Sequence, residues 1–208
     1  MTTAIWWIRR DLRLTDNPAL AAALAQADQV IPTFILDPSL LGSSYVGSKR
    51  LAFLLDGLRH LDSDLRALGS RLIVRRGDPR RKLSALRGES GASLIFAEED
   101  FSPYARQRDA EVARDLPLQL VNGLTLHPPG AVLKADGTPY VVFTPFSRAW
   151  KALPLPQAGG ISPAPDRIST PTGLSSLPIP TEPALPSAVP FPPGQAEAQR
   201  RLSAFVLG

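Results

Sequence analysis

The segment AIWWIRRDLRLTDNPALAAAL, residues 4–24, contains the pattern that decides the fold. Its first five residues, AIWWI, are all apolar, as expected of a strand that is buried on both faces of a parallel sheet. Farther on, Asn17 can cap a helix that Pro18 opens at its first position, and good helix formers follow. A strand therefore passes into a helix through a loop of charged residues, which is the first unit of an α/β fold.

The alternation of strand and helix patterns continues along the chain. Further strands are expected at residues 30–36, 71–76, 93–97 and 118–121, and further helices at 48–68, 79–88 and 103–116. The helix over 48–68 is the most clearly marked, because seven leucines at spacings of three and four form one apolar stripe. Pro32 fits its strand poorly, since proline has no N–H to donate to a ladder. The pattern predicts a Rossmann-like α/β fold with a five-stranded, mainly parallel sheet and helices on both faces.

Proline is unevenly distributed along the chain. Twelve of the 22 prolines fall between Pro154 and Pro193, whereas ten are spread over residues 1–151. The skew predicts a globular domain over residues 1–130, followed by an extended, proline-rich linker over 131–195. Residues 196–208 have an amphipathic pattern that is typical of a helix.

The composition excludes several classes of function. The chain has no cysteine and two histidines, which excludes a disulfide framework and leaves too few soft ligands for a zinc site. No window approaches the roughly 20 apolar residues of a membrane span, and no signal peptide is recognisable, so we expect a cytoplasmic protein. The net charge of +4 permits an anionic partner. However, the arginines are scattered and do not alternate with aromatic residues, as a groove for single-stranded nucleic acid would require.

The loops after the strands are the candidate binding sites, because ligands of open parallel sheets lie beyond the carboxyl ends of the strands, where the strand order reverses. The loop at residues 9–18 is dense in arginine and aspartate, and Glu98, Glu99 and Asp100 follow the strand at 93–97. Two interpretations stay open for these loops. Their charges either pair with one another and cap helices, or they hold a polar ligand.

The common motifs of nucleotide binding and hydrolysis are not found in the sequence. No G-x-G-x-x-G follows the first strand, and no G-x-x-x-x-G-K-[ST] occurs. A nucleophile elbow and a plausible Ser/His/Asp set are missing as well, so we do not expect hydrolytic catalysis. An adenine-nucleotide-binding protein of related topology stays a hypothesis that rests on the fold alone. For Trp6 and Trp7, which belong to the first strand, we expect core packing.

Several stretches together resemble the amino-terminal domain of the DNA photolyase and cryptochrome family. They are IWWIRRDLRLTDNPALAAAL (5–24), FILDP (34–38), GSRLIVRRGDP (69–79), EEDFSPYARQRD (98–109), LHPPGAVLKADGTPYVVFTPFSRAW (126–150) and PPGQAEAQRRLSAFV (192–206). The likeness spans almost the whole chain. It is specific because the RRDLRL-x-DNPAL block occurs together with the TPF-x-x-AW block.

The resemblance implies a parallel α/β domain that binds a light-harvesting antenna chromophore and is joined by a long connector to a helical, FAD-binding domain. In photolyases of the family, the photoexcited reduced flavin passes an electron to a pyrimidine dimer flipped out of DNA, and the antenna delivers excitation to that flavin. Family members are more than twice as long as this chain. Residues 196–208 would then begin the first helix of an FAD-binding domain that is otherwise missing. The implied function is the antenna-binding domain of a deoxyribodipyrimidine photolyase, and we expect no repair by this chain alone.

The resemblance also implies which residues line the antenna site. They come from the loops after the first, second and fourth strands and from the region around the start of the long helix: Arg9, Asp11, Leu36, Asp37, Val46, Arg50 and Asp100. In the folate-binding branch an Asn-Glu pair contacts the pterin, whereas the matching stretch here is Tyr104-Ala105. FMN or 8-hydroxy-5-deazaflavin is therefore favoured over methenyltetrahydrofolate.

The implied partners follow from the same resemblance. The domain would pack against the FAD-binding helical domain of its parent protein, and DNA would be contacted through the full-length protein. We expect a monomeric fragment with no membrane or metal partner. A fragment of a signalling cryptochrome and a ligand-free interaction module stay open as alternatives, because residues 1–208 do not separate repair from signalling.

Overall fold

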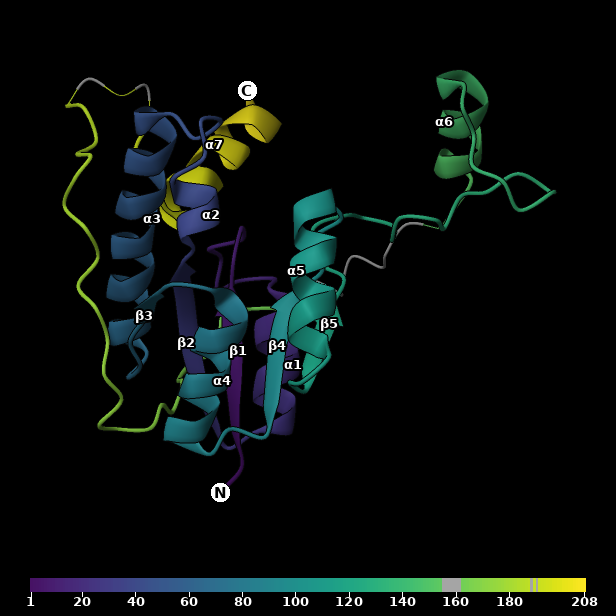
Figure 1. Ribbon diagram of the computed structural model, residues 1–208. Coiled ribbons are helices and arrows are strands. Elements are labelled where there is room, and N and C mark those ends of the chain that lie inside the picture. The colour runs from purple at the N-terminus through teal and green to yellow at the C-terminus, as the bar shows by residue number, and fades with distance from the viewer. Residues whose placement is uncertain (155–161, 188, 190) are drawn as a thin grey trace.

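The computed structural model describes residues 1–208 except 155–161, 188 and 190. Its five strands form one sheet in the order β3-β2-β1-β4-β5 (Figure 1). They are β1 (Thr3–Ile8), β2 (Gln29–Leu36), β3 (Ile73–Arg76), β4 (Leu94–Glu98) and β5 (Leu118–Val121). Every neighbouring pair is parallel, which confirms the predicted Rossmann-like fold. Pro32 is tolerated within β2 because the ladder with β3 begins one residue later, at Thr33.

The helices of the α/β body follow the strands as the sequence predicts, except that one short helix, Pro38–Leu41, was not predicted. The structure contains α1 (Pro18–Gln26), α2 (Pro38–Leu41), α3 (Ser48–Ala67), α4 (Pro79–Ser90), α5 (Pro103–Ala113), α6 (Phe143–Lys151) and α7 (Gln195–Leu207). Four of them, α1, α2, α4 and α5, start with a side-chain cap followed by proline. The predicted end of α4 at Gly88 was too early, since the helix continues to Ser90 and ends at Gly91, whose φ is 68°.

Both faces of the sheet are covered by helices. Side chains of β1 alternate between the two faces, so Trp6 packs with residues of α1 and α3, whereas Trp7 packs with residues of α4 and α5. On the α1–α3 face, Leu58 of α3 is fully buried, and on the α4–α5 face, Leu83 of α4 is fully buried. The AIWWI run is apolar throughout because neither side of this central strand meets water.

Residues 162–180 form a strap that packs on the α/β body. Ile168 is 0% exposed within the core on the α1–α3 face, and its N–H donates to Leu68 O at 2.9 Å. Farther along, Leu177 N–H donates to Val74 O at 3.0 Å, so the strap covers the edge strand β3 (Figure 1). The predicted linker thus contains an ordered part, while its residues 155–161, 188 and 190 lie outside the described chain. The domain boundaries at 130 and 195 stay a prediction.

Residues 122–154 form an arm that leaves the body after β5 and carries α6 at its far end (Figure 1). Helix α6 was not predicted, because it begins without a side-chain cap and lies in the proline-rich part assigned to the linker. His127 packs edge-on against Trp150 within the arm, with ring centroids 5.1 Å apart. Several large apolar side chains of the arm, including Val141 and Phe143, are exposed.

The buried contact of the strap predicts a measurable loss of stability. Ile168→Ala should lower the free energy of unfolding by about 2–4 kcal/mol, because it leaves a cavity in the core. Leu177→Ala is the matched control within the same strap, since Leu177 is 46% exposed, and it should cost less than about 1 kcal/mol. Urea unfolding followed by circular dichroism measures both values. Equal losses for the two variants would contradict the packing of the strap.

Candidate functional site

A cavity of about 590 Å³ lies at the carboxyl ends of β1 and β2. Its wall also includes residues of α2, the start of α3 and α4, the loop after β4, and α5. The strand order reverses at β1, because the chain proceeds from β1 through β2 to β3 and then returns to place β4 on the other side. The cavity therefore occupies the position at which open parallel sheets bind their ligands.

Four of the seven predicted site residues line this cavity: Arg9, Asp37, Arg50 and Asp100. Arg9 and Asp37 directly follow β1 and β2, Asp100 lies two residues beyond β4, and Arg50 is in the first turn of α3. The structure thus brings together side chains from four separate loops and elements, as expected from the convergence of parallel strand ends.

The other three predicted residues lie outside this wall. Leu36 is 3% exposed and packs in the core on the α1–α3 face. Val46 is half-buried in the turn before α3. Asp11 points instead at Arg13, whose N–H donates to Asp11 Oδ1 at 2.9 Å and whose side chain forms an ion pair with the same carboxylate at 2.7 Å. The hydrogen bond with Asp11 raises the pKa of Arg13.

The charged loop after β1 shows the ion pairing and helix capping of the first interpretation, and its role in holding a polar ligand stays a prediction. Asp11 and Arg13 pair with each other, and Asn17 caps α1 by accepting the N–H of Leu20 at 2.9 Å. Arg9 and Arg10, by contrast, line the cavity. The first two arginines of RRDLR therefore lie in the wall of the cavity, whereas Asp11 and Arg13 of the motif contribute to the local structure of the loop.

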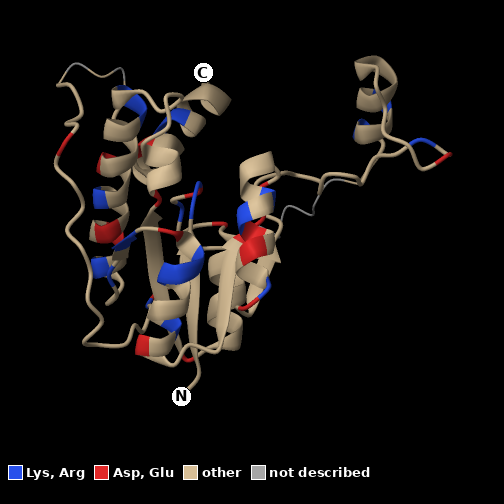
Figure 2. Cartoon of the chain, in the orientation of Figure 1, with Lys and Arg blue, Asp and Glu red and all other residues tan. Residues whose placement is uncertain are grey.

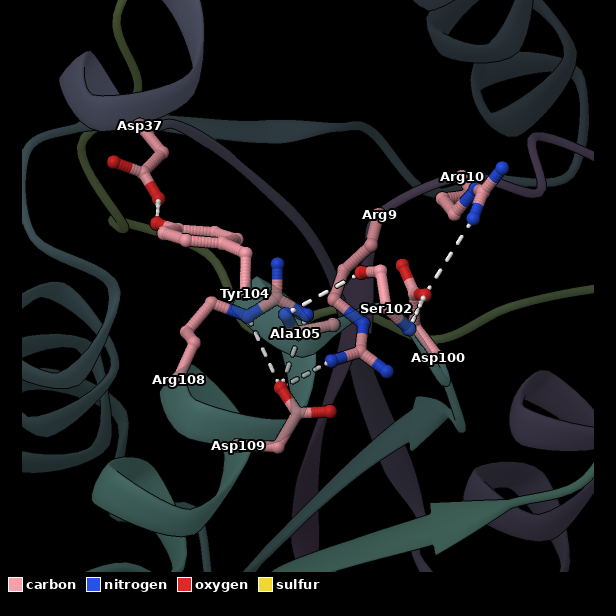
Figure 3. Close-up of polar contacts among 9 residues, drawn as sticks. All are labelled: Arg9, Arg10, Asp37, Asp100, Ser102, Tyr104, Ala105, Arg108 and Asp109. Carbon is pink, nitrogen blue, oxygen red and sulfur yellow. Dashed lines mark hydrogen bonds and ion pairs between the residues drawn. The ribbon is translucent and has the colours of Figure 1, made fainter.

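Arg9 and Arg108 share one buried carboxylate, that of Asp109 (Figure 3). Arg9 Nη1 donates to Asp109 Oδ1 at 2.5 Å, and Arg108 Nε donates to the same oxygen at 3.0 Å. All three side chains are about nine-tenths buried or more. Burial and the nearby charge of Arg108 lower the pKa of Arg9. Both guanidinium groups lie over the ring of Trp7, with Cζ 4.8 and 4.9 Å from its centroid.

Tyr104 and Asp37 close another part of the wall (Figure 3). The Tyr104 hydroxyl donates to the Asp37 carboxylate, which also caps α2 by accepting the N–H of Ser39 at 2.9 Å. Burial, together with this carboxylate, raises the pKa of Tyr104 to about 12. The contact links α5 to the end of β2, and the Tyr104 ring also lies 5.6 Å from the Arg108 guanidinium.

Asp100 has a structural role as well as a place in the wall. Its Oδ1 accepts the N–H of Ser102 at 3.0 Å and lies 3.5 Å from Arg10 Nη1 (Figure 3). Burial acts to raise the pKa of Asp100, but the hydrogen bonds from Ser102 and the charges of Arg10 and Arg9 outweigh it and hold the pKa below its ordinary value. Asp100 is therefore an ionised group at the end of β4.

Ten residues of the wall were not among the predicted site residues, and Trp7, Tyr104 and Arg108 are three of the aromatic and charged ones whose contacts are described above. Tyr104 and Arg108 are four residues apart just after the cap of α5, so they lie on one helical face. This spacing was a usable signal. Trp7 is two residues before Arg9 and points to the same side of the sheet, but a tryptophan in an apolar strand is typical of the core and gives no separate signal.

Glu98 at the end of β4 is a buried acid beside this site. It is 8% exposed, and its Oε1 has no hydrogen-bond partner among the described residues. Gly123 approaches so closely that a Cβ there would stand 2.3 Å from Oε1, so any larger residue would displace the carboxyl group. Burial, and next the charge of Asp11, raise the pKa of Glu98 from 4.5 to about 7.

The raised pKa predicts a pH-dependent cost to stability. At pH values well below 4.5, Glu98 is protonated in the folded and unfolded chain alike. Between 4.5 and about 7, ionisation favours the unfolded chain, so the free energy of unfolding falls as the pH rises. Glu98→Gln removes this loss and should raise stability by about 1 kcal/mol at pH 8, after allowance for solvent screening, with little effect at pH 4.

Thermal melts over this pH range test the prediction, with Glu99→Gln as the control that removes the same charge one residue away. A difference between Glu98→Gln and the wild type that does not grow with pH would refute the assignment of the shift to Glu98.

Neither a membrane span nor a metal centre is found in the described part of the chain. No helix there is long and apolar enough to cross a bilayer. No group of three or more His, Cys, Asp or Glu side chains gathers there as metal ligands would.

A family model described as DNA photolyase matches residues 4–165 of the chain. The deoxyribodipyrimidine photo-lyase of Synechococcus sp. is 36% identical over 178 residues, which cover 83% of this chain and 35% of that relative. A bacterial class III photolyase from Agrobacterium tumefaciens superposes with a TM-score of 0.87 at 29% identity, covering 100% of this chain and 45% of its own.

An archaeal photolyase from Sulfolobus tokodaii, whose structure contains two FAD molecules and implies a novel light-harvesting cofactor, gives a TM-score of 0.71 at 26% identity and covers 84% of this chain and 40% of its own. The chain thus spans less than half the length of each of these three proteins. Because the family match covers most of the chain and the α/β body superposes on solved photolyases, this chain belongs to the DNA photolyase family and corresponds to its amino-terminal α/β domain.

Proposed function

We propose that this domain binds a flavin-type antenna chromophore, FMN or 8-hydroxy-5-deazaflavin, in the cavity at the carboxyl ends of the strands. The observation that carries the proposal is the cavity itself, which lies at the reversal of strand order and gathers side chains from four loops and elements. In the whole protein, the bound chromophore would deliver excitation to a catalytic flavin, and any repair of pyrimidine dimers would take place there.

The size and the wall of the cavity suit a planar, heteroaromatic ligand. Its volume of about 590 Å³ falls within the range of about 300–1,000 Å³ that is usual for small-molecule sites. Trp7, Phe34 and Leu40 supply apolar surface, while arginine side chains supply donors for the carbonyl oxygens and ring nitrogens of a flavin. The buried Arg9 Nη2 has no hydrogen-bond partner among the described residues, which shows that the donors around this site are not all used by the protein.

A relative of known structure supports a flavin as the light-harvesting cofactor. The Sulfolobus tokodaii photolyase contains a second FAD that implies a light-harvesting cofactor, and it superposes on 84% of this chain. A folate is disfavoured for this chain because Tyr104-Ala105 stands where the folate-binding branch has the Asn-Glu pair that contacts the pterin.

We further propose that α7 and the neighbouring groove face the helical domain of the whole protein, which would also carry the contact with DNA. Leu202, Phe205 and Val206 of α7 are exposed apolar side chains. Between α3 and α7 lies a second cavity of about 450 Å³, whose wall includes Phe53 and Phe191. The relatives named above extend well beyond the length of this chain, which leaves them residues for such a domain.

Chromophore binding can be tested directly by visible absorption. The chain is incubated with FMN, 8-hydroxy-5-deazaflavin or methenyltetrahydrofolate, passed through a desalting column and scanned. We expect the flavin-type ligands to be retained and the folate to be lost. Leu40→Trp should reduce flavin retention at least tenfold, because a larger side chain at this position of the wall fills part of the cavity.

Leu120→Trp is the matched control for Leu40→Trp. Leu120 lies on the edge strand β5, away from the cavity. Its side chain is 41% exposed, and that of Leu40 is 40% exposed. This control should retain the ligand as the wild type does. If the wild type retains none of the three chromophores, or if both variants lose binding equally, the proposed site is wrong.

A further inference from the structure

The guanidinium group of Arg108 has one edge committed to the protein and one edge free. Nε and Nη2 both lie 3.0 Å from Asp109 Oδ1, so this edge of the planar group faces Asp109 (Figure 3). Nη1 lies on the other side of Cζ, and no hydrogen bond joins it to the described residues; the buried Nη2 pairs with Asp109 by charge but without hydrogen-bond geometry. Because Arg108 lines the cavity, this free edge is available to a ligand there.

The position of Arg108 is fixed before any ligand arrives. Its Cζ lies 4.9 Å from the ring centroid of Trp7 and 5.6 Å from that of Tyr104. Tyr104 is itself held by Asp37, and Asp109 is held from its other side by Arg9. The protein contacts therefore order the flexible arginine side chain before binding. A ligand that binds to it does not have to bear this entropic cost.

The charges around the cavity leave an excess of one positive charge. Four guanidinium groups and two carboxylates line the wall, and the carboxylate of Asp109 lies behind it. The positive groups are Arg9, Arg10, Arg50 and Arg108, and the negative groups are Asp37, Asp100 and Asp109. Two of the arginines share the single carboxylate of Asp109. A buried charge without a full counter-charge is costly, so an anionic group in the cavity would be stabilised.

We propose that Arg108 anchors an anionic oxygen of the chromophore, so that the site selects ligands carrying a phosphate or an ionised ring hydroxyl over neutral flavins. This inference rests on the proposed function, because it assigns the part of the chromophore that the site recognises. The anionic oxygen could come from the phosphate of FMN or from the ring hydroxyl of 8-hydroxy-5-deazaflavin, and the two sources can be told apart.

Three ligands that differ at these positions provide the test. Riboflavin has neither anionic group, FMN adds a phosphate, and phosphate-free 8-hydroxy-5-deazaflavin adds an acidic ring hydroxyl. Dissociation constants are measured at pH 8 by equilibrium dialysis against the chain of residues 1–208. We expect at least one of the two anionic ligands to bind about tenfold or more tightly than riboflavin, the effect typical of one charge-assisted hydrogen bond.

Variants of Arg108 then locate the selectivity. Arg108→Gln should bring the dissociation constants of the anionic ligand and riboflavin to within about twofold of each other, whatever its effect on overall affinity. Arg108→Lys should restore part of the preference, because it keeps the positive charge but lacks the planar guanidinium group. Arg106→Gln is the matched control, since it removes the same charge from an exposed position of the same helix. Circular dichroism and thermal melts establish that each variant is folded.

The outcomes separate the inference from the proposed function. Preference for FMN that is lost in Arg108→Gln assigns the phosphate as the anchored group, and preference for the deazaflavin that is lost there assigns the ring hydroxyl. If all three ligands bind the wild type equally, the inference is wrong although the chromophore site stands. If none of them binds, the proposed function fails and the inference falls with it. Should Arg108→Gln not fold, Arg108→Lys takes its place in this comparison, and an undiminished preference for the anionic ligand in a folded variant of Arg108 overturns the inference.

Discussion

The buried carboxylate of Asp109 is the group on which the geometry of the cavity depends. It joins Arg9, which follows β1, to Arg108 on α5, so a central strand and a helix of the opposite half of the sheet are fixed relative to each other. Both guanidinium groups then rest on Trp7, whose ring is held in the core by α4 and α5. Removal of the carboxylate would leave two buried cations without a counter-charge, a larger penalty than the loss of a surface ion pair.

The caps of the helices also build the wall of the cavity. In a parallel sheet, each strand must be followed by a turn and a helix start, and here several of these turns carry an acidic or hydroxyl side chain followed by proline. Asp37 caps α2 and also accepts the hydroxyl of Tyr104, and Ser102 caps α5 next to Asp100. Local requirements of helix capping thus place polar groups at the strand ends, where a ligand can use them.

Most of the fold could be predicted from local patterns, whereas the site could be predicted only in part. AIWWI, the leucine stripe of α3 and the repeated cap-proline pairs are local signals, and each corresponds to an observed element. Arg9 and Asp37 were predictable because they follow strands. Arg108 had only the signal of its four-residue spacing from Tyr104, because its place in the wall depends on a partner about 100 positions away in sequence, Arg9, through Asp109. The strap was missed for a similar reason, since proline content predicts stiffness but does not reveal the burial of Ile168.

Arg10 and Arg50 connect the proposed chromophore site with the proposed interface of the helical domain. Both line the cavity at the strand ends, and both also line the second cavity between α3 and α7. A chromophore in the first cavity would therefore lie one layer of side chains from the surface on which we propose that the rest of the protein packs. Excitation transfer needs proximity and orientation and does not require covalent contact. The α/β body would fix the orientation of the chromophore, and the two arginines would separate the chromophore from the interface. Both arginines are held in place, because Arg50 belongs to the long helix α3 and Arg10 to the loop that Arg9 anchors.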